Sequence, residues 1–175
     1  MNDSTRPTPG ANTVPVTPTI PLAGEEATLA LGAALASPGA AALAGRVLHL
    51  SGDLGAGKTT LVRGLLRRLG HEGRVKSPTY ALLESYVVSG LDLYHFDFYR
   101  FKDREEWVNS GFREHFNPAS LCIVEWPEMA EGLLSPPDLH LRLDIAAPGR
   151  RVRLDALSPD GRRWRASALS SLLSA

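Results

Sequence analysis

The chain has 175 residues, of which 43% are hydrophobic and 22% are charged, and its formal net charge is zero. This length suits one domain of ordinary size and leaves little room for a separate substrate lobe. A neutral chain has no overall field that would draw it onto nucleic acid or an anionic membrane, which restricts such binding to a local basic patch. The single cysteine, Cys122, argues against an internal disulfide and against a cysteine-based metal site.

Residues 1–19 are rich in Pro and Thr and contain no apolar run. Such a composition cannot bury enough surface to offset the entropy of ordering, so a disordered tail is predicted. The missing apolar run also argues against a secretory signal. The folded domain is expected over residues 20–175.

The first predicted helix covers Glu25–Leu35. The Ala-rich stretch that overlaps it, Ala27–Ala44, is apolar enough to be considered as a membrane span. Pro38 interrupts this stretch and two glutamates stand at its head, so a helix that ends before Pro38 and packs on a core is the better interpretation. We therefore expect a cytoplasmic protein that does not enter a membrane.

The segments that follow alternate between strand and helix patterns. Val47–Leu50 is a short apolar run before a glycine-rich turn, which predicts a buried strand. Lys58–Leu69 carries leucines along one face, which predicts a helix. Ala81–Val88 and Leu91–Tyr99 predict the two strands of a hairpin, with Ser89-Gly90 as the turn between them.

The C-terminal half completes the pattern of a mixed sheet. Its expected elements are a short helix capped by Asp103 and reaching Trp107, a helical piece at Phe112–Phe116, a buried strand at Leu121–Val124, half-exposed antiparallel strands at Leu139–Ile145 and Arg151–Leu157 joined by Pro148-Gly149, and a helix at Trp164–Leu173. Together the elements predict an α/β domain whose sheet is part parallel and part antiparallel, with helices on its faces.

The turn after the first buried strand matches the P-loop pattern G-x-x-x-x-G-K-[ST] over Gly52–Thr59. Its glycines let backbone N–H groups turn toward an anion, and the N-terminus of the next helix adds partial positive charge. Lys58 supplies a full charge for the β- and γ-phosphates, and the Thr59 hydroxyl is a hard oxygen ligand that suits Mg²⁺. The residues expected to bind the nucleoside triphosphate here are Gly55, Ala56, Gly57, Lys58, Thr59 and Thr60.

A P-loop needs a carboxylate to complete its magnesium site, usually at the end of a neighbouring apolar strand. Glu125 directly follows the strand Leu121–Val124, so it is favoured as the metal-linked residue. Asp97 lies late in a more amphipathic strand and is a candidate for orienting water or relaying the state of the γ-phosphate. The alternative for each is a solvated carboxylate at a strand end.

A third group of polar residues is Ser77-Pro78-Thr79-Tyr80, which follows the P-loop helix after a short connection. In nucleotide switches a hydroxyl on a mobile loop at this point senses the γ-phosphate and Mg²⁺, and Thr79 is placed to do so. A plain proline turn before a strand is an equally good interpretation of the spacing alone.

Four segments occur in an order that closely resembles the TsaE (YjeE) family: Gly52–Thr60, Lys76–Tyr80, Tyr94–Arg100 and Val124–Pro127. This family is the small ATPase of the bacterial machinery that makes N6-threonylcarbamoyladenosine (t6A) in tRNA. The first segment alone is generic, whereas the four in order are highly specific. The resemblance covers roughly residues 20–157.

The resemblance implies a P-loop NTPase-type three-layer fold with a mixed parallel and antiparallel sheet. It implies Mg²⁺-dependent ATP hydrolysis that is weak in isolation and stimulated by partner proteins. The implied partners are TsaB and TsaD, whose complex transfers the threonylcarbamoyl group to adenosine 37 of tRNAs reading ANN codons. The protein itself would not perform this transfer and would reach tRNA only through the complex.

The resemblance also assigns roles to single residues. It gives Lys58 to the phosphates, Thr59 and Glu125 to magnesium, Asp97 to hydrolysis, Ser77 and Thr79 to a switch-like loop, Trp126 to a structural or nucleotide-sensing place beside the site, and Thr28 and Arg150 to the approach of the base. Asp97, Glu125 and Lys58 are thus the expected catalytic residues. The Pro/Thr-rich tail departs from the family pattern, and we expect it to be dispensable for ATP hydrolysis.

Two other function classes remain to be tested. A small-molecule kinase shares the P-loop but needs an acceptor pocket and an Arg-rich lid; the alternation in Arg150–Arg153 suits a sheet edge better than a lid. An RNA-binding module could use the basic-aromatic cluster around Trp164, although a solvated turn and helix start explains that cluster as well. His49, His95 and His115 lack the paired spacing of a zinc site, so each is expected to be packed or hydrogen-bonded.

Overall fold

The computed structural model describes residues 17 and 19–174. The predicted tail lies outside the described residues, apart from Thr17 and Thr19. Thr19 is the first residue of a strand, one residue before the expected start of the domain.

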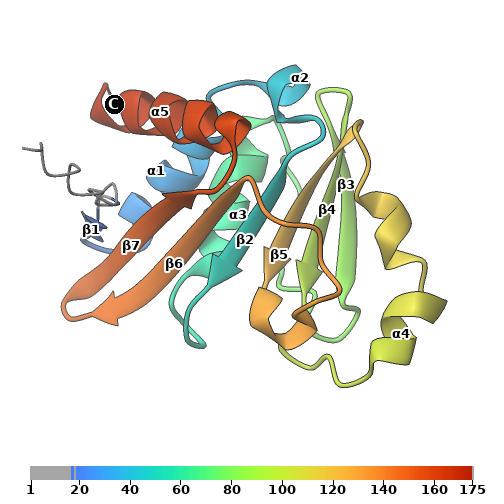
Figure 1. Ribbon diagram of the computed structural model, residues 1–175. Helices are drawn as coiled ribbons and strands as arrows, with labels where there is room; N and C mark the ends of the chain where they lie inside the picture. Colours follow the sequence, from blue (N-terminus) through green and yellow to red (C-terminus); the bar gives the residue numbers. More distant parts are fainter. Residues whose placement is uncertain (1–16, 18, 175) are drawn as a thin grey trace, which may run out of the picture.

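The strands form one seven-stranded sheet in the order β1-β7-β6-β2-β5-β4-β3 (Figure 1). β2 runs parallel to β5 and β6, and β4 runs parallel to β5, whereas the pairs β3–β4, β6–β7 and β1–β7 are antiparallel. The strands are β1 (Thr19–Leu22), β2 (Val47–Ser51), β3 (Leu83–Val88), β4 (Leu91–Asp97), β5 (Ser120–Glu125), β6 (Leu139–Ala146) and β7 (Gly149–Ala156). The predicted hairpin and the predicted mixed sheet are both confirmed.

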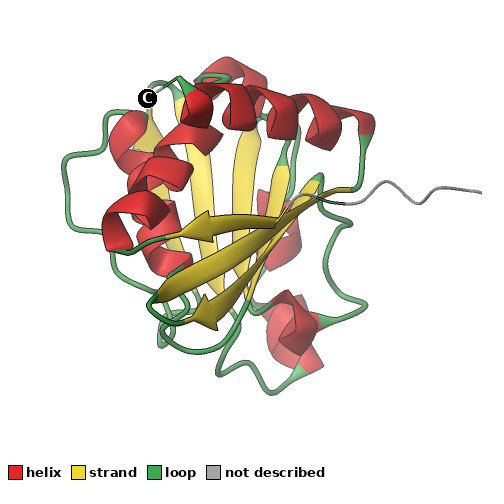
Figure 2. Ribbon diagram, turned by 90° about the vertical axis from the view of Figure 1, so that its left-hand side faces the viewer, coloured by secondary structure: helices red, strands yellow, loops and turns green. Residues whose placement is uncertain are grey.

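Helices lie on both sides of the sheet, as Figure 2 shows. They are α1 (Glu25–Leu35), α2 (Ala40–Leu43), α3 (Lys58–Arg68), α4 (Arg104–Asn109), α5 (Pro159–Leu173) and the 3₁₀ helices η1 (Phe112–His115) and η2 (Pro127–Ala130). Helices α1, α3 and α5 share one hydrophobic cluster with the sheet, and α4 and η1 share a second cluster that includes Phe96 and Val124. The result is the expected three-layer α/β architecture.

Three sequence expectations need correction. The last helix begins at Pro159 rather than Trp164, because the Ser158 hydroxyl accepts a hydrogen bond from the Gly161 N–H and caps it five residues earlier. Strand β1 was not expected, since only its pairing with β7 makes this four-residue segment a strand. For the same reason Arg150–Arg153 does not lie at a sheet edge: β7 has β1 on one side and β6 on the other.

The basic-aromatic cluster near the C-terminus does not present its aromatic ring to a ligand. Trp164 is 3% exposed, and its indole N–H donates to the Leu35 carbonyl at 2.8 Å. A base cannot stack on a ring that is buried between helices, so this cluster offers no platform for RNA. Within residues 17 and 19–174, no helix combines the length and hydrophobicity that crossing a bilayer requires.

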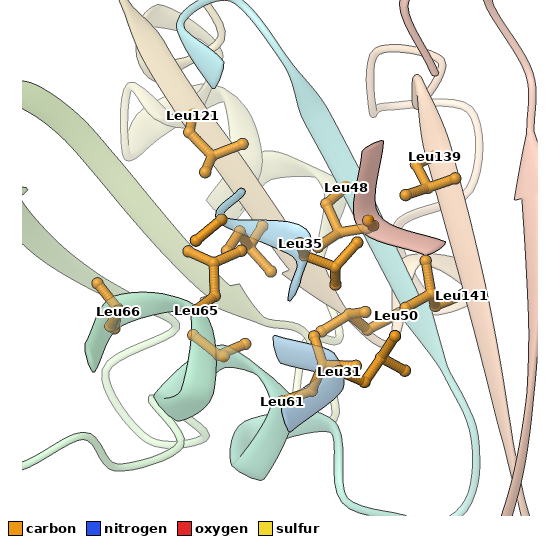
Figure 3. Packing of buried hydrophobic residues seen from close by; sticks show 14 of the residues in the cluster. Leu31, Leu35, Leu48, Leu50, Leu61, Leu65, Leu66, Leu121, Leu139 and Leu141 are labelled. Carbon is orange, nitrogen blue, oxygen red and sulfur yellow. The ribbon is translucent and has the colours of Figure 1, made fainter. Parts of the chain in front are cut away.

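The larger core lies between the sheet and helices α1, α3 and α5 (Figure 3). Leucines from α1, α3 and strands β2, β5 and β6 converge there, and the predicted inward residues Leu31 and Leu35 are fully buried. The predicted leucine stripe of α3 is buried as well. This packing holds α3, and with it the P-loop, against the C-terminal end of β2.

Helices α1 and α3 cross with their backbones in contact. A Cβ added at Gly32 would lie 2.1 Å from the Leu61 carbonyl oxygen, and one added at Gly64 would lie 2.2 Å from the Leu29 carbonyl oxygen. Both distances are far too short for real atoms, so each position admits only glycine at this helix separation. The crossing sets the position of α3 relative to α1.

We expect Gly64→Ala to lower the free energy of unfolding by about 1–3 kcal/mol, because the added methyl must push the helices apart. At an open helical position the same change would instead stabilise the protein by roughly 1 kcal/mol. Urea unfolding of the two proteins measures the difference. Gly24→Ala is the control, since a Cβ there meets nothing within 4 Å; an unchanged or raised stability for Gly64→Ala would contradict the packing argument.

A buried histidine makes the stability depend on pH. His49 on β2 is the register partner of His140 on β6, and burial, aided by the charge of His140, lowers the pKa of His49 from 6.5 to about 3. Between these two values the unfolded chain binds a proton that the folded chain does not, so stability is lost as pH falls through this window. Replacing His49 by Leu should reduce the loss of stability at low pH, measured by urea unfolding across this pH range. Equal losses of stability in the wild-type protein and the variant would contradict the role of His49.

Candidate functional site

A pocket of about 290 Å³ opens where the P-loop meets the C-terminal ends of β4 and β5. Its lining residues are Glu25, Leu54, Gly55, Gly57, Lys58, Thr59, Thr60, Ser77, Thr79, Asp97, Tyr99, Glu125, Trp126 and Arg150. β2, β5 and β4 are adjacent parallel strands, so their C-terminal ends share one edge of the sheet, where α/β proteins bind ligands. The topology thus explains why segments far apart in sequence meet here.

The pocket contains almost all of the site residues that the sequence predicts. Ala56 and Thr28 are the exceptions, since both are fully buried and neither lines the pocket. Sequence reasoning missed Glu25, Leu54 and Tyr99. Tyr99 lies two residues after Asp97 in the same motif, a proximity that could have indicated it, whereas the first turn of α1 gives no local signal that Glu25 reaches the P-loop.

The P-loop has room for an anion because its glycines keep side chains out of it. Gly52, Gly55 and Gly57 all have positive φ, at 142°, 82° and 104°. A Cβ at Gly52 would lie 2.3 Å from the Leu143 carbonyl oxygen. Gly57 is the N-cap of α3, so the free N–H groups of the first helical turn face the same space.

Lys58 brings a buried positive charge to the pocket. It is 4% exposed, and its Nζ donates to the Gly52 and Asp53 carbonyl oxygens, the second at 2.9 Å. Burial lowers the pKa of Lys58, while the nearby carboxylates, Glu125 first among them, raise it. An ammonium in this partly desolvated setting attracts anions more strongly than one in bulk water would.

Trp126 covers this ammonium. The Lys58 Nζ lies 4.1 Å from the centroid of the indole ring. The Tyr99 ring lies beside the same indole, with 4.9 Å between the ring centroids and the two rings tilted relative to each other. Trp126 reaches this position from a left-handed backbone conformation, with φ 58° directly after β5, which is strained for a residue with a side chain. The predicted place of Trp126 beside the site is the one that it occupies.

Glu125 and Thr59 are in direct contact. The Thr59 hydroxyl donates to Glu125 Oε1 at 2.8 Å, and Glu125 is 2% exposed at the end of β5. A threonine hydroxyl beside a buried carboxylate is a hard oxygen set of the kind that Mg²⁺ prefers. Within the described residues, no three His, Cys, Asp or Glu side chains form a metal cluster, so any magnesium here would rely on ligand phosphates and water as well.

Asp97 is the register neighbour of Glu125 across β4 and β5, and it holds the Ser77–Thr79 loop. Its Oδ2 accepts hydrogen bonds from the hydroxyls of Ser77 and Thr79, the latter at 2.7 Å, and its Oδ1 accepts one from the Tyr99 N–H at 2.9 Å. Asp97 is 2% exposed, so it is not a solvated strand end. The loop is likewise more than a plain turn, because its hydroxyls contact the site.

The structure brings Thr28 and Arg150 together beside the cradle. The Arg150 guanidinium donates to the Thr28 hydroxyl at 3.0 Å, and a Cβ at Gly57 would lie 3.3 Å from each of these side chains. Arg150 lines the pocket and Thr28 stands behind it. Thr28 therefore orients Arg150 in this structure, and the approach of a base to either residue stays a prediction.

His95 is hydrogen-bonded, as expected, but sequence reasoning did not name its partner. Its Nε2 lies 2.9 Å from Glu125 Oε1, and the ring is fully buried. Strand periodicity could have indicated that His95 belongs to the site, because it stands two residues before Asp97 and thus on the same face of β4.

Comparisons with known proteins agree on one family. The family model described as "Threonylcarbamoyl adenosine biosynthesis protein TsaE" matches residues 22–153. The tRNA threonylcarbamoyladenosine biosynthesis protein TsaE of Haemophilus influenzae is 47% identical over 110 residues, which cover 63% of this chain and 70% of the relative. The protein of the same name from Bacillus subtilis is 38% identical over 134 residues, covering 77% and 78%.

A solved structure shares the fold. The crystal structure of YdiB from Bacillus subtilis aligns with a TM-score of 0.68 and 26% sequence identity. The alignment covers 90% of this chain and 95% of that one, so the likeness extends over the whole fold rather than the P-loop alone.

The position of Trp126 predicts an optical signal. Because its ring lies over Lys58, we expect ADP with Mg²⁺ to change the tryptophan fluorescence as the ammonium turns toward the phosphates. Trp107 and Trp164 are buried, at 2% and 3% exposure, and should contribute a constant background. Trp126→Phe should abolish the change; a change that persists in this variant would contradict the assignment.

Proposed function

The chain belongs to the TsaE family, and from this premise we propose that it is a Mg²⁺-dependent ATPase that supports a TsaB–TsaD-type complex in the threonylcarbamoylation of adenosine 37 of tRNAs reading ANN codons. In this proposal the chain hydrolyses ATP and leaves the transfer of the threonylcarbamoyl group to its partners. The observation that carries it is the single pocket in which the P-loop, the Thr59–Glu125 contact and the Asp97-bound loop meet.

The residues of the pocket fit a nucleoside triphosphate. The P-loop glycines leave space for an anion, the N–H groups of the first turn of α3 face it, and the Lys58 ammonium contacts the carbonyl oxygens of the loop. Phosphates would replace the carbonyl oxygens of Gly52 and Asp53 as partners of Lys58. Arg150, beside Gly57, offers a second cation at the other wall.

The donor set also fits magnesium. The Thr59 hydroxyl donates a hydrogen bond to Glu125, so the lone pairs of its oxygen are free to ligate a cation. Bound magnesium would neutralise charge on the phosphates and act as a Lewis acid. Glu125 accepts a hydrogen bond from the Thr59 hydroxyl and would be the acidic residue of the magnesium site, which is the role that the family resemblance gives it.

Asp97 links this chemistry to the loop. In the present arrangement two of its three hydrogen bonds come from Ser77 and Thr79. If these hydroxyls turn toward the phosphates, a carboxylate oxygen becomes free to orient an attacking water. Hydrolysis would then depend on the conformation of the loop, which would account for the low rate in isolation and the stimulation by partners that the family resemblance implies.

A small-molecule kinase is the alternative, and one feature argues against it. Arg150–Arg153 was the segment that resembled an Arg-rich lid, but it lies within β7 and is paired on both sides. A strand that is paired on both sides cannot close over phosphates as a lid does. We infer cytoplasmic action with soluble partners, in keeping with a tRNA-modifying machinery.

The proposal is tested by measuring phosphate release from ATP with and without a TsaB–TsaD complex. Lys58→Ala should abolish nucleotide binding, because the charge for the phosphates is lost. Glu125→Ala and Asp97→Ala should keep most of the nucleotide affinity and slow turnover by at least about 100-fold, as expected for groups that act on metal and water.

Arg67→Ala is the control, since Arg67 is exposed at the far end of α3 and should leave the rate unchanged. Glu125→Ala hydrolysing ATP at the wild-type rate with partners present would contradict the role of Glu125. Transfer of the γ-phosphate to an added small-molecule acceptor would favour the kinase.

A further inference from the structure

His95 occupies a position where an apolar residue would be expected. Strand β4 alternates, and Leu91, Leu93 and His95 lie on the face that packs toward α3. Leu91 and Leu93 are buried there, and His95 is 0% exposed. Within the described part of the chain its Nδ1 has no hydrogen-bond partner. Burying a polar ring with an unsatisfied nitrogen destabilises the fold, so packing alone does not account for this residue.

The other ring nitrogen has a specific partner. His95 Nε2 lies 2.9 Å from Glu125 Oε1, the same oxygen that accepts from the Thr59 hydroxyl at 2.8 Å. If the proton were on Nδ1, the Nε2 lone pair would face the lone pairs of a carboxylate, which is repulsive. A hydrogen bond between His95 and the Glu125 carboxylate therefore requires the proton on Nε2, with His95 as the donor.

Two donors on one oxygen determine how the carboxylate is turned. Oε1 can accept two hydrogen bonds, and the Thr59 hydroxyl and His95 Nε2 both lie within hydrogen-bond distance of it. Oε2 has no hydrogen-bond partner among the described residues and remains available to the pocket that Glu125 lines. With Thr59 alone, the glutamate could rotate about that one bond, and its negative charge would draw it toward the nearby Lys58 ammonium.

We propose that His95 is a positioning residue for the hydrolysis site: it donates from Nε2 to Glu125 Oε1 and holds the carboxylate so that Oε2 stays available to the pocket. The proposal rests on the proposed ATPase function for its effect on turnover. The hydrogen bond itself belongs to this chain and can be tested without nucleotide.

His49 shows that burial alone does not produce this arrangement. It too is buried and has an Nε2 without a partner in the described residues, yet its aromatic neighbour is His140 and no carboxylate contacts it. His95 differs because its remaining nitrogen bonds to the residue that contacts Thr59. Groups that hold a ligand of a metal site in this way typically change metal affinity or activity by about 10- to 100-fold when they are removed.

The test compares His95→Gln with His95→Met. The two side chains have nearly the same length and volume, but only glutamine carries an N–H donor near the position of Nε2. We expect His95→Met to lower phosphate release, and to raise the Mg²⁺ concentration needed for half-maximal release, by roughly 10- to 100-fold. Binding of ADP in EDTA, measured by calorimetry, should stay near wild type, and His95→Gln should recover most of the loss.

A second measurement uses the nucleotide-free protein and needs no histidine variant to fold. Nitrogen-15 NMR of the imidazole rings should show His95 protonated at Nε2, with a slowly exchanging proton whose resonance shifts in Glu125→Gln. The resonances of His49 should not change in that variant, because His49 lies on β2 facing His140. A histidine with a purely structural role would be insensitive to Glu125.

The outcomes separate the two proposals. Normal turnover in His95→Met, or equal losses in His95→Met and His95→Gln, would overturn the positioning role, as would an Nδ1-protonated ring in the nucleotide-free spectrum. If wild-type protein with partners released no phosphate, the ATPase proposal would fail, and the NMR result would still decide whether His95 holds Glu125.

Discussion

One ammonium and two carboxylates are buried together at the C-terminal edge of the sheet, and most of the site follows from that constraint. Lys58, Asp97 and Glu125 are each at most 4% exposed. Removing such ions from water is costly unless opposite charges and hydrogen bonds replace the solvent. The replacements come from separate segments and include the P-loop carbonyls and the side chains of Thr59, Ser77, Thr79 and His95. Groups of the chain itself therefore hold the three charged side chains in defined positions.

The fold meets this constraint through topology and one close helix contact. Parallel pairing of β2, β5 and β4 places Glu125 and Asp97 side by side next to the loop that follows β2. The close contact between α1 and α3 at Gly32 and Gly64 then fixes the distance between these two helices, and with it the position of the first turn of α3 relative to α1. Thr28 of α1 consequently meets Arg150 of β7 beside the P-loop, across a separation of 122 residues.

The sequence predicts what is local and misses what depends on distant partners. The P-loop, α1, the hairpin and the acid at the end of β5 all carry their signals within a few residues, and the structure contains each of them. Strand β1 carries no such signal, because its four residues become a strand only by pairing with β7. Trp164 looked like a surface residue among arginines, but its ring is buried because it meets the end of α1. The partner of His95 was hidden for the same reason: 30 residues separate it from Glu125, and only the β4–β5 register makes them neighbours.

That register also places Asp97, which holds the Ser77–Thr79 loop, next to Glu125. Asp97 makes hydrogen bonds with the loop and with the residues just after it. The hydroxyls of Ser77 and Thr79 donate to the Asp97 side chain, and the Asp97 N–H donates to the Leu82 carbonyl oxygen at 3.1 Å. Leu82 has φ 63°, a conformation that costs energy for a residue with a side chain and persists only where its surroundings hold it. A movement of the loop therefore changes the hydrogen bonds of Asp97 first, and Asp97 is the direct cross-strand neighbour of Glu125. The charges of both carboxylates raise the pKa of Lys58, so the ammonium is electrostatically coupled to each of them. In the proposed ATPase, coupling between the loop and the P-loop would then need no long pathway, because a single pair of adjacent strands carries both acids.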